Sequence, residues 1–325
     1  MKSVVARVLV LSAFVAAPFV QTNHYWQHVF CVALIGVVLA LGMQLLLGMA
    51  GLLSLGQAAF YGIGAYVSAA LTLYFGAPFL VAFILAGVAA AICSLLLVPI
   101  VRLPGSSLAV ATLGFNIIIY LVLLNEDWAT GGSFGIMNVP APRIFGFAFA
   151  GERAMYFLCL FVAVVVYLGM ERLVHSRFGR ALRAISQDED AARASGISVN
   201  LYKSKCFLVA AFTAGIAGSL YAHQARYINP YDFSFTKSIE ILIMVVVGGL
   251  GSMPGAVVGA LIVVLAPEYL RSSGELRLIL FGALVVVLMG FSRGGVAGLV
   301  SVLGQQLTRF RPLRASKATS SGEPQ

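Results

Sequence analysis

Long apolar runs recur along the whole chain, and they constrain its fold more than any other feature. Runs near or above about 18 residues are long enough for an apolar helix to cross the hydrocarbon core of a bilayer. Only 10% of the 325 residues are charged, whereas a soluble domain usually carries about a quarter. We therefore predict an all-α fold, a polytopic transmembrane helix bundle in contact with the lipid bilayer. About ten membrane segments can be read, at roughly 5–20, 28–47, 52–73, 79–101, 107–124, 153–173, 205–222, 238–250, 254–270 and 275–292.

The distribution of basic residues indicates how this bundle is oriented. With the N-terminus inside, fifteen of the 21 Lys and Arg residues fall in cytoplasmic segments and six fall on the other side. Basic residues gather in cytoplasmic loops, so we predict that both termini are cytoplasmic. The same rule accounts for the net charge of +9. No basic patch interleaved with aromatic residues indicates nucleic acid as a partner.

The chain is predicted to form one domain with a short tail. We assign residues 1–304 to a transmembrane domain, with a long outer loop at 125–152 and a long cytoplasmic loop at 174–204. Residues 305–325 are polar and basic, and we expect a disordered cytoplasmic tail. The first twenty residues have the pattern of a signal peptide, but a retained first span is favoured because the topology needs it. The four cysteines are interpreted as small buried apolar residues, not as disulfides or metal ligands.

The cytoplasmic loop contains HSRFGRALRAISQDEDAARASGISVNLYK, residues 175–203. Ser186 is followed three residues later by Glu189, which is a capping-box pattern, and Gly196 suits the left-handed position after a helix. These signals predict a short helix at about 187–195, preceded by a basic helical stretch at about 177–185. Small side chains on the short helix would let a partner approach closely. A docking surface and an ordinary solvated loop helix are equally compatible with this pattern.

Two glycine-rich stretches interrupt the apolar segments. In GGLGSMPGAVVGA, residues 248–260, the glycines at 251, 255 and 259 form a small-residue ridge for close helix packing, while Gly248, Gly249 and Pro254 oppose a continuous helix. Either a packing kink or a broken helix beside a translocation path would explain this stretch. In GLLSLGQAAFYGIGAY, residues 51–66, a second small-residue stripe is expected along one helix face. Its members are Gly51, Ser54, Ala58, Gly62, Ala65 and Ala69.

Several polar side chains lie inside predicted spans. Gln57 and Tyr61 are four residues apart, and Gln57 should point into the bundle because an unpartnered amide is costly in hydrocarbon. Two interpretations of Gln57 are therefore equally compatible with the sequence: it forms an interhelical hydrogen bond, or it is part of the polar lining of a translocation path. Asn116 and Glu240 are further candidates for a cavity, although Glu240 lies three residues after Lys237, where an interfacial ion pair is the simpler account.

Motifs for other chemistries are missing from the sequence. His24 and His28 are four residues apart but are better explained as an interfacial anchor beside Tyr25 and Trp26 than as half of a metal site. No phosphate-binding loop of the G-x-x-x-x-G-K-[ST] type occurs, and no catalytic set of residues stands in a supporting context. We therefore expect no enzyme activity, no cofactor and no metal.

Three stretches together resemble one family, the membrane permeases of high-affinity branched-chain amino-acid ABC importers. They are GLLSLGQAAFYGIGAY, then GRALRAISQDEDAARASGI with a following span that contains AGIAGSLYA, and then SIEILIMVVVGGLGSMPGAVVGA. They stand in the family's order, and the resemblance runs from about residue 30 to 295. The outer loop with ATGGSFGI resembles the larger of the two paired permeases.

The resemblance implies a transmembrane permease subunit that forms a path by alternating access in the bacterial inner membrane. Its implied partners are a second homologous permease, two cytoplasmic ABC ATPase subunits and a periplasmic solute-binding protein. ATP would then be hydrolysed on other chains, which fits the missing phosphate loop. The family also includes importers of urea, short amides and other amino acids, and an ion-coupled secondary transporter is the alternative from another class.

The predicted site residues fall into three sets. The resemblance implies ATPase coupling by Gly179, Arg180, Ala181, Ala184, Ser186, Asp188, Glu189, Ala191, Ala192 and Gly196. Candidates for the translocation path are Ser54, Gln57, Tyr61, Asn116, Glu240, Gly248, Gly249 and Gly251. Close helix packing is expected at Gly51, Ala58, Gly62, Gly255 and Gly259.

Overall fold

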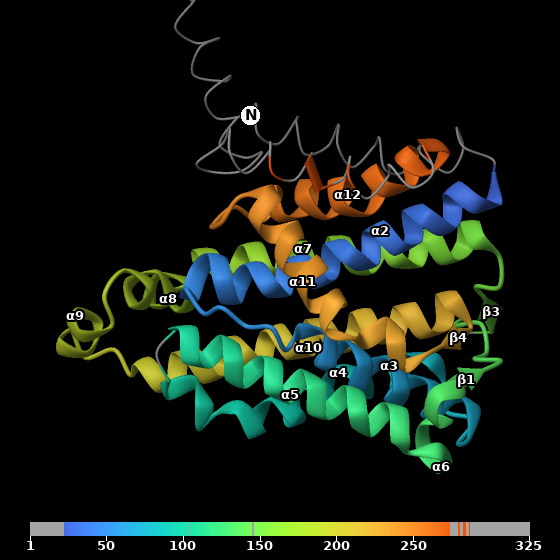
Figure 1. The fold of residues 1–325 in the computed structure, drawn as a ribbon, viewed down its shortest axis with the longest axis horizontal. Coiled ribbons are helices and arrows are strands. Elements are labelled where there is room, and N and C mark those ends of the chain that lie inside the picture. The colour runs from blue at the N-terminus through green and yellow to red at the C-terminus, as the bar shows by residue number, and fades with distance from the viewer. Residues whose placement is uncertain are drawn as a thin grey trace, which may run out of the picture.

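The computed structural model describes residues 23–273 except Pro104 and Phe145, together with Ile279, Gly282, Ala283 and Val286. Most of these residues are helical (Figure 1). The predicted first segment, nearly all of the last one, the tail at 305–325 and the signal-peptide alternative lie outside the described residues. Each of the eight other predicted segments corresponds to a helix.

Five helical stretches are long and apolar enough to cross a membrane among the described residues. They are α2 (His24–Met43) with its π-helical continuation η1 (Gln44–Met49), α4 (Phe79–Ser94) with η2 (Leu95–Leu97), α5 (Gly105–Asn125), α7 (Glu152–His175) and α10 (Val199–Ala225). Three shorter helices pack among them: α3 (Gln57–Leu73), α11 (Phe235–Gly248) and α12 (Met253–Tyr269).

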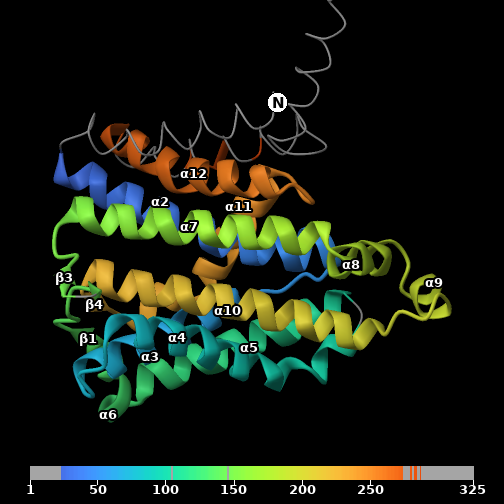
Figure 2. The ribbon, with the colours of Figure 1, turned by 180° about the vertical axis from the view of Figure 1, so that it is seen from behind.

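The remaining elements gather at the two ends of the bundle (Figures 1 and 2). One end carries α8 (Arg177–Gln187) and α9 (Glu189–Ala194). The opposite end carries α6 (Asp127–Thr130), η4 (Gly132–Phe134) and four short strands. The strands pair antiparallel, β1 (Ile136–Met137) with β4 (Tyr227–Ile228) and β2 (Arg143–Ile144) with β3 (Phe147–Ala148). The short 3-10 helices η3 (Ile100–Arg102), η5 (Pro230–Phe233) and η6 (Leu270–Ser273) complete the described chain.

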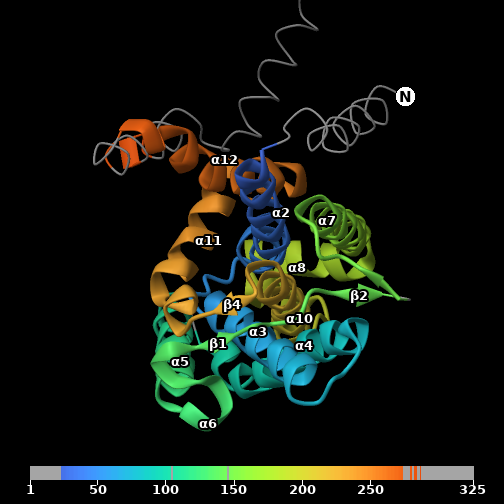
Figure 3. The ribbon, with the colours of Figure 1, turned by 90° about the vertical axis from the view of Figure 1, so that its right-hand side faces the viewer.

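The helices form two groups that meet at the centre of the molecule (Figure 3). In one group α3 packs against α4, α5 and α10, and in the other α2 packs against α7, α11 and α12. Helices α2 and α10 contact each other and join the groups. Both are largely buried, whereas α4, α5 and α7 expose much of their surface. The core therefore lies along the α2–α10 contact.

The outer helices are apolar on the side that faces away from this core. On α4 every fourth side chain is a large exposed aliphatic one: Leu80, Ile84, Val88 and Ile92. The opposite face of the same helix carries small, fully buried side chains at Ala82, Ala86 and Ala90. Residues four apart share one face of a helix. An apolar outer face opposite a small-residue inner face is typical of a helix that packs on protein inside and on lipid outside.

Backbone-to-backbone packing holds α3 against α10. A Cβ atom added to Gly64 would lie 2.1 Å from the carbonyl oxygen of Gly215, and one added to Gly218 would lie 2.0 Å from the carbonyl oxygen of Tyr61. Only glycine permits this approach, in which van der Waals contact replaces the hydrophobic driving force that is missing between helices in lipid. The glycines that permit this contact, at positions 64 and 218, do not belong to the predicted small-residue stripe.

The predicted stripe on residues 51–69 needs a correction. Helix α3 begins only at Gln57, so Gly51 and Ser54 lie in a non-helical segment that follows η1. Gly51 has a φ of 68°, a left-handed conformation that glycine adopts without strain. Within α3, the stripe members Ala58, Gly62, Ala65 and Ala69 are all buried, and Gly62 faces the Phe233 ring.

The second glycine-rich stretch forms a tight hairpin between α11 and α12. The predicted interruption is present, because Gly249 and Gly251 have φ values of 107° and 83° and the Ser252 hydroxyl accepts from the Gly255 amide at 3.1 Å to begin α12. Gly251 therefore lies in the turn and not on a helical ridge, which corrects the prediction. Gly255 and Gly259 do pack closely, against the backbone of Gly248 and Met244 in α11.

Candidate functional site

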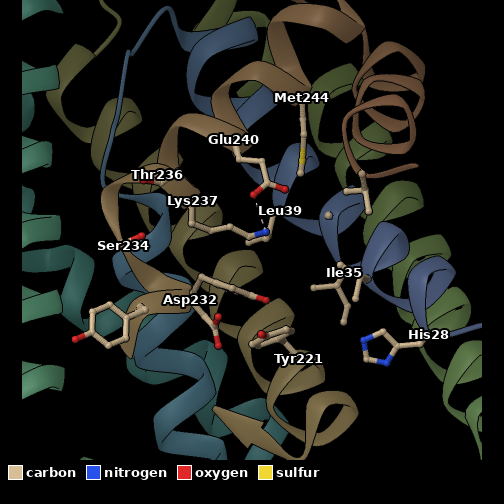
Figure 4. Close-up of a pocket in the computed structure, with 15 residues that line it drawn as sticks. His28, Ile35, Leu39, Tyr221, Asp232, Ser234, Thr236, Lys237, Glu240 and Met244 are labelled. Carbon is tan, nitrogen blue, oxygen red and sulfur yellow. Dashed lines mark hydrogen bonds and ion pairs between the residues drawn. The ribbon is translucent and has the colours of Figure 1, made fainter. Parts of the chain in front are cut away.

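A partly open cavity of about 360 Å³ lies among the helices, and the residues that line it belong mainly to α2, α11 and η5. Its walls come from α2 and α11, which face each other, and from η5, with single contributions from α3, α10 and α12. Figure 4 shows polar side chains of η5 and α11 pointing into the same space. The polar lining includes His28, Tyr61, Tyr221, Tyr231, Asp232, Lys237 and Glu240, and the apolar lining includes Val32, Ile35, Leu39, Met244 and Val264.

Helical spacing places the lining side chains on two facing surfaces. On α2 the residues at 32, 35 and 39 are three and four positions apart, and on α11 the residues at 237, 240 and 244 have the same spacing. Side chains at these intervals lie on one face of a helix. The two faces therefore differ in character, since the α2 face is aliphatic and the α11 face carries a cation, an anion and a thioether.

The third wall, η5, is fixed by its own cap. The Asn229 side chain accepts from the Tyr231 amide at 3.0 Å, and the Asp232 carboxylate accepts from the Asn229 amide at 3.4 Å. These two bonds form a capping box at the start of the short helix. They hold Asp232 at the cavity, with one carboxylate oxygen accepting from the Asn229 amide.

Three charged groups meet at the cavity. The Lys237 Nζ atom lies 2.9 Å from Glu240 Oε2, with 23% and 35% of the two side chains exposed. Asp232 adds a second carboxylate. The expected ion pair of Glu240 with Lys237 is therefore present. Because both partners line the cavity, Glu240 is at once an ion-pair partner and a residue of the cavity wall. His28 lines the opposite side, where its Nδ1 atom lies 2.7 Å from the Gln224 side-chain nitrogen.

Of the predicted path residues, only Tyr61 and Glu240 line this cavity. The Ser54 hydroxyl instead accepts from the Gly56 amide at 3.4 Å within the non-helical segment. Gln57 and Asn116 are buried, and within the described part of the chain no hydrogen-bond partner reaches their side-chain atoms. Among the described residues Gln57 therefore makes no interhelical hydrogen bond, and its place on the translocation path stays a prediction.

The predicted path glycines belong to a second region, where two helix breaks touch. The Gln44 side chain donates to the carbonyl oxygen of Gly249 at 3.2 Å. A Cβ atom on Gly48 would lie only 2.7 Å from the Gly251 nitrogen, so the π-helical end of α2 contacts the α11–α12 turn. The Leu55 amide donates to Thr112 Oγ1 at 2.9 Å. Irregular backbone at membrane depth is tolerated where protein groups satisfy it in this way.

These breaks also contact α8. A Cβ atom on Gly51 would lie 3.4 Å from the Cβ atom of Ser186 in the last turn of α8. At its start, α8 folds directly onto the end of α7, because Gly179 lies against the backbone of Val174. The α8 side chains of Ala181, Leu182 and Ile185 are buried. The helix is therefore docked on the bundle rather than free in solvent.

The cap of α9 differs from the prediction. The Asp188 carboxylate accepts from the amides of Asp190 and Ala191 at 2.9 and 3.0 Å, so Asp188 is the N-cap. Ser186 is still helical in α8, where its hydroxyl donates to the Arg183 carbonyl. Ser and Asp are comparable caps, but a carboxylate also gains from the positive end of the helix dipole.

Glu189 forms an ion pair in place of the predicted capping box. It contacts Lys203 of α10, whose side chain is only 3% exposed. Gly196 ends α9 with the predicted left-handed backbone, at a φ of 81°, and the Ile197 amide donates to the Ala192 carbonyl. Helix α9 is thus held at both ends. Among the remaining predicted coupling residues, Arg180 and Ala191 are exposed, Ala184 is half-buried, and Ala192 is buried.

A bundle of long apolar helices with a charged internal cavity and broken helices beside it is typical of a multi-pass membrane transport protein. A family model described as "Branched-chain amino acid transport system / permease component" matches residues 26–289. The chain belongs to this family of permeases.

Curated relatives agree with the family match. The high-affinity branched-chain amino acid transport system permease protein LivM of Escherichia coli K12 is 33% identical over 306 residues, which cover 87% of this chain and 72% of the relative. LivM of Salmonella typhimurium LT2 is 34% identical over 280 residues, 79% of this chain and 66% of the relative. LivH of the same Salmonella strain is 29% identical over 176 residues, 53% of each chain. The more extensive match to LivM confirms the predicted type of permease.

Proposed function

We propose that this chain is the transmembrane permease subunit of an ATP-driven ABC importer for branched-chain amino acids. The observation that carries the proposal is the family match over residues 26–289, which spans both the cavity and the α8–α9 segment. The relatives that bear the name LivM or LivH are permeases of branched-chain amino acid transport systems. ATP hydrolysis would take place on partner subunits, and this chain would supply the path.

The proposed orientation places the α8–α9 end in the cytoplasm of a bacterial cell and the strand end outside the inner membrane. Arg177, Arg180, Arg183 and Arg193 are exposed at the α8–α9 end, which supports this orientation because basic residues stay on the cytoplasmic side. The full bundle would have about ten segments within residues 1–304 and cytoplasmic termini, with residues 305–325 as a tail.

The proposed partners attach at opposite ends. A second, homologous permease would complete the path, and two ABC ATPase subunits would dock on α8 and α9. A periplasmic binding protein would deliver the solute at the strand end. Alternating access then requires that motion at α8 reaches the cavity. The contacts Ser186–Gly51, Gly48–Gly251 and Gln44–Gly249 form a continuous series from α8 to α11, and α11 carries one wall of the cavity.

The decisive experiment is uptake by the reconstituted complex. The chain is purified with its second permease and both ATPases, placed in proteoliposomes and supplied with its loaded binding protein. We expect uptake of labelled leucine with ATP and none with a non-hydrolysable ATP analogue. Uptake without ATP hydrolysis would instead identify an ion-coupled secondary transporter.

The same vesicles test the choice of solute. Labelled urea, a short amide and other amino acids are offered under identical conditions. Uptake of one of these solutes, with leucine left outside, would contradict the branched-chain assignment while keeping the chain in the importer family.

A further inference from the structure

We propose that the cavity between α2 and α11 is itself a binding site for a small aliphatic zwitterion, in which Lys237 binds the carboxylate, Asp232 binds the ammonium group and the α2 face receives the side chain. This inference rests on the proposed function of the chain as an importer permease. It adds a site of chemical selectivity inside the membrane subunit.

The charges of the cavity match the two ends of an α-amino acid. The Lys237 ammonium group has three N–H donors, and Glu240 accepts one of them at 2.9 Å, so donors are available for an incoming carboxylate. Asp232 and Glu240 are two acceptors against this one cation, which leaves one carboxylate for an ammonium group. Tyr61 and Tyr221 add hydroxyl groups to the lining. A ligand with both charges satisfies both partners, and a neutral or singly charged ligand satisfies at most one.

The wall opposite the charges fits an aliphatic side chain. It consists of Val32, Ile35 and Leu39 on one face of α2, with Val264 of α12 beside them. Gly36 lies within this wall and adds no side chain, and a Cβ atom there would already lie 3.3 Å from Val264 and 3.4 Å from Met244. Met244 is unbranched and polarizable, so it adapts to branched side chains of different shape.

The size and composition of the cavity narrow the ligand class further. A volume of about 360 Å³ lies at the low end of small-molecule sites, which span roughly 300–1,000 Å³. Within the described residues, no group of three His, Cys, Asp or Glu side chains is placed to hold a metal ion. A single amino acid therefore fits better than a peptide or a coordinated cation. Urea and short amides carry no charge and would leave the charged groups without a ligand partner.

The first test is equilibrium binding of labelled leucine to the whole membrane complex in lipid nanodiscs, without ATP and without the binding protein. Unlabelled leucine competes with two analogues of the same aliphatic shape, 4-methylpentanoate and 3-methylbutylamine, which each lack one charge. A hydrogen bond to a charged group changes affinity by about tenfold or more. We expect each analogue to compete at least about tenfold more weakly than leucine, and equal competition by either analogue would overturn the charge assignment.

The second test uses variants of the charged lining. We expect Lys237→Gln and Asp232→Asn each to weaken leucine binding by about tenfold, and Lys237→Arg to restore most of it. Asparagine keeps an acceptor for the Asn229 amide, so the η5 cap survives. The exposed residues Arg143 and Glu126 supply matched controls, Arg143→Gln and Glu126→Gln, with unchanged binding. Copurification of the partner subunits verifies that each variant assembles.

A charge-reversed variant distinguishes a role of Lys237 in leucine binding from a purely structural role of its ion pair with Glu240. Lys237→Glu with Glu240→Lys keeps an ion pair at the same spacing, so leucine binding would return if the pair only stabilised α11. We expect binding to stay weak, and its full return would overturn the proposal. A wild-type complex that transports leucine with ATP but binds none in nanodiscs would also overturn it, while leaving the proposed function intact. Failure of ATP-dependent transport itself would contradict the proposed function.

Discussion

Glycine at positions 64 and 218 determines how closely α3 and α10 approach each other, and glycine at position 215 does the same for α10 and α4. At each position a methyl group would meet backbone or a packed neighbouring side chain, not the movable end of a flexible chain. Backbone cannot move aside without shifting a whole helix, so these sites tolerate no side chain. Gly169 in α7 is helical and exposed, and a Cβ atom there would meet nothing within 4 Å.

This contrast gives a prediction for stability. We expect Gly218→Ala to destabilise the folded protein by about 1–3 kcal/mol, the usual cost of overpacking, and Gly169→Ala to be neutral or slightly stabilising. The measurement is the temperature at which detergent-solubilised protein loses its monodisperse peak in size-exclusion chromatography. Equal transition temperatures for the two variants would show that the close α3–α10 contact is not required.

At the scale of elements, α8 and α9 are built from signals that are partly visible in the sequence. The left-handed glycine after α9 was predictable, because its position follows from local spacing. The choice of cap was not, since Ser186 and Asp188 are both good caps and only the end of α8 decides between them. The Glu189–Lys203 contact joins residues fourteen positions apart, and no local pattern indicates it.

The larger elements also combine features that the sequence predicts with features that it does not predict. Hydropathy located the eight apolar helices α2, α3, α4, α5, α7, α10, α11 and α12 among the described residues, because an apolar run is a local property. It did not separate the helical glycines at 62 and 64 from the non-helical ones at 51 and 56, because these differ in tertiary partners and not in neighbours. The cavity takes its polar lining from α2, α3, α10, η5 and α11. Sequence reasoning found Tyr61 and Glu240 as polar groups within spans, but nothing in the sequence indicates that Asp232 and Tyr221 lie beside them.

The end of α9 gives a prediction at this scale. Gly196→Val forces a β-branched residue into the left-handed region, at a cost on the order of 1–2 kcal/mol, and should distort the surface proposed for ATPase docking. We expect slower ATP-driven leucine uptake, with solute capture by the binding protein unchanged. Ser195→Val places the same side chain one residue earlier, where φ is −82°, and serves as the control. Wild-type uptake by Gly196→Val would contradict the role of this segment in coupling.

For the molecule as a whole, the two ends of the bundle are predicted to face different compartments. The exposed residue Ser133 lies at the strand end, and the exposed residue Ser195 lies at the α8–α9 end. In a variant whose four native cysteines are replaced, we expect a membrane-impermeant maleimide to label Ser133→Cys in spheroplasts. Ser195→Cys should react only after the membrane is permeabilised, and the reverse pattern would invert the assigned orientation.

The shortness of α11 affects how much protein would separate a bound solute from the cytoplasm in the proposed orientation. This helix has 14 residues, about 21 Å in length, against a hydrocarbon core of about 30 Å. Met244 at the cavity lies only five positions, about 7.5 Å along the helix axis, before Gly249 at the helix break. On α2 the stretch from Leu39 to Gly48 spans about 13 Å. In the proposed orientation, between one and three helical turns would therefore separate a solute in the cavity from the touching helix breaks on the cytoplasmic side.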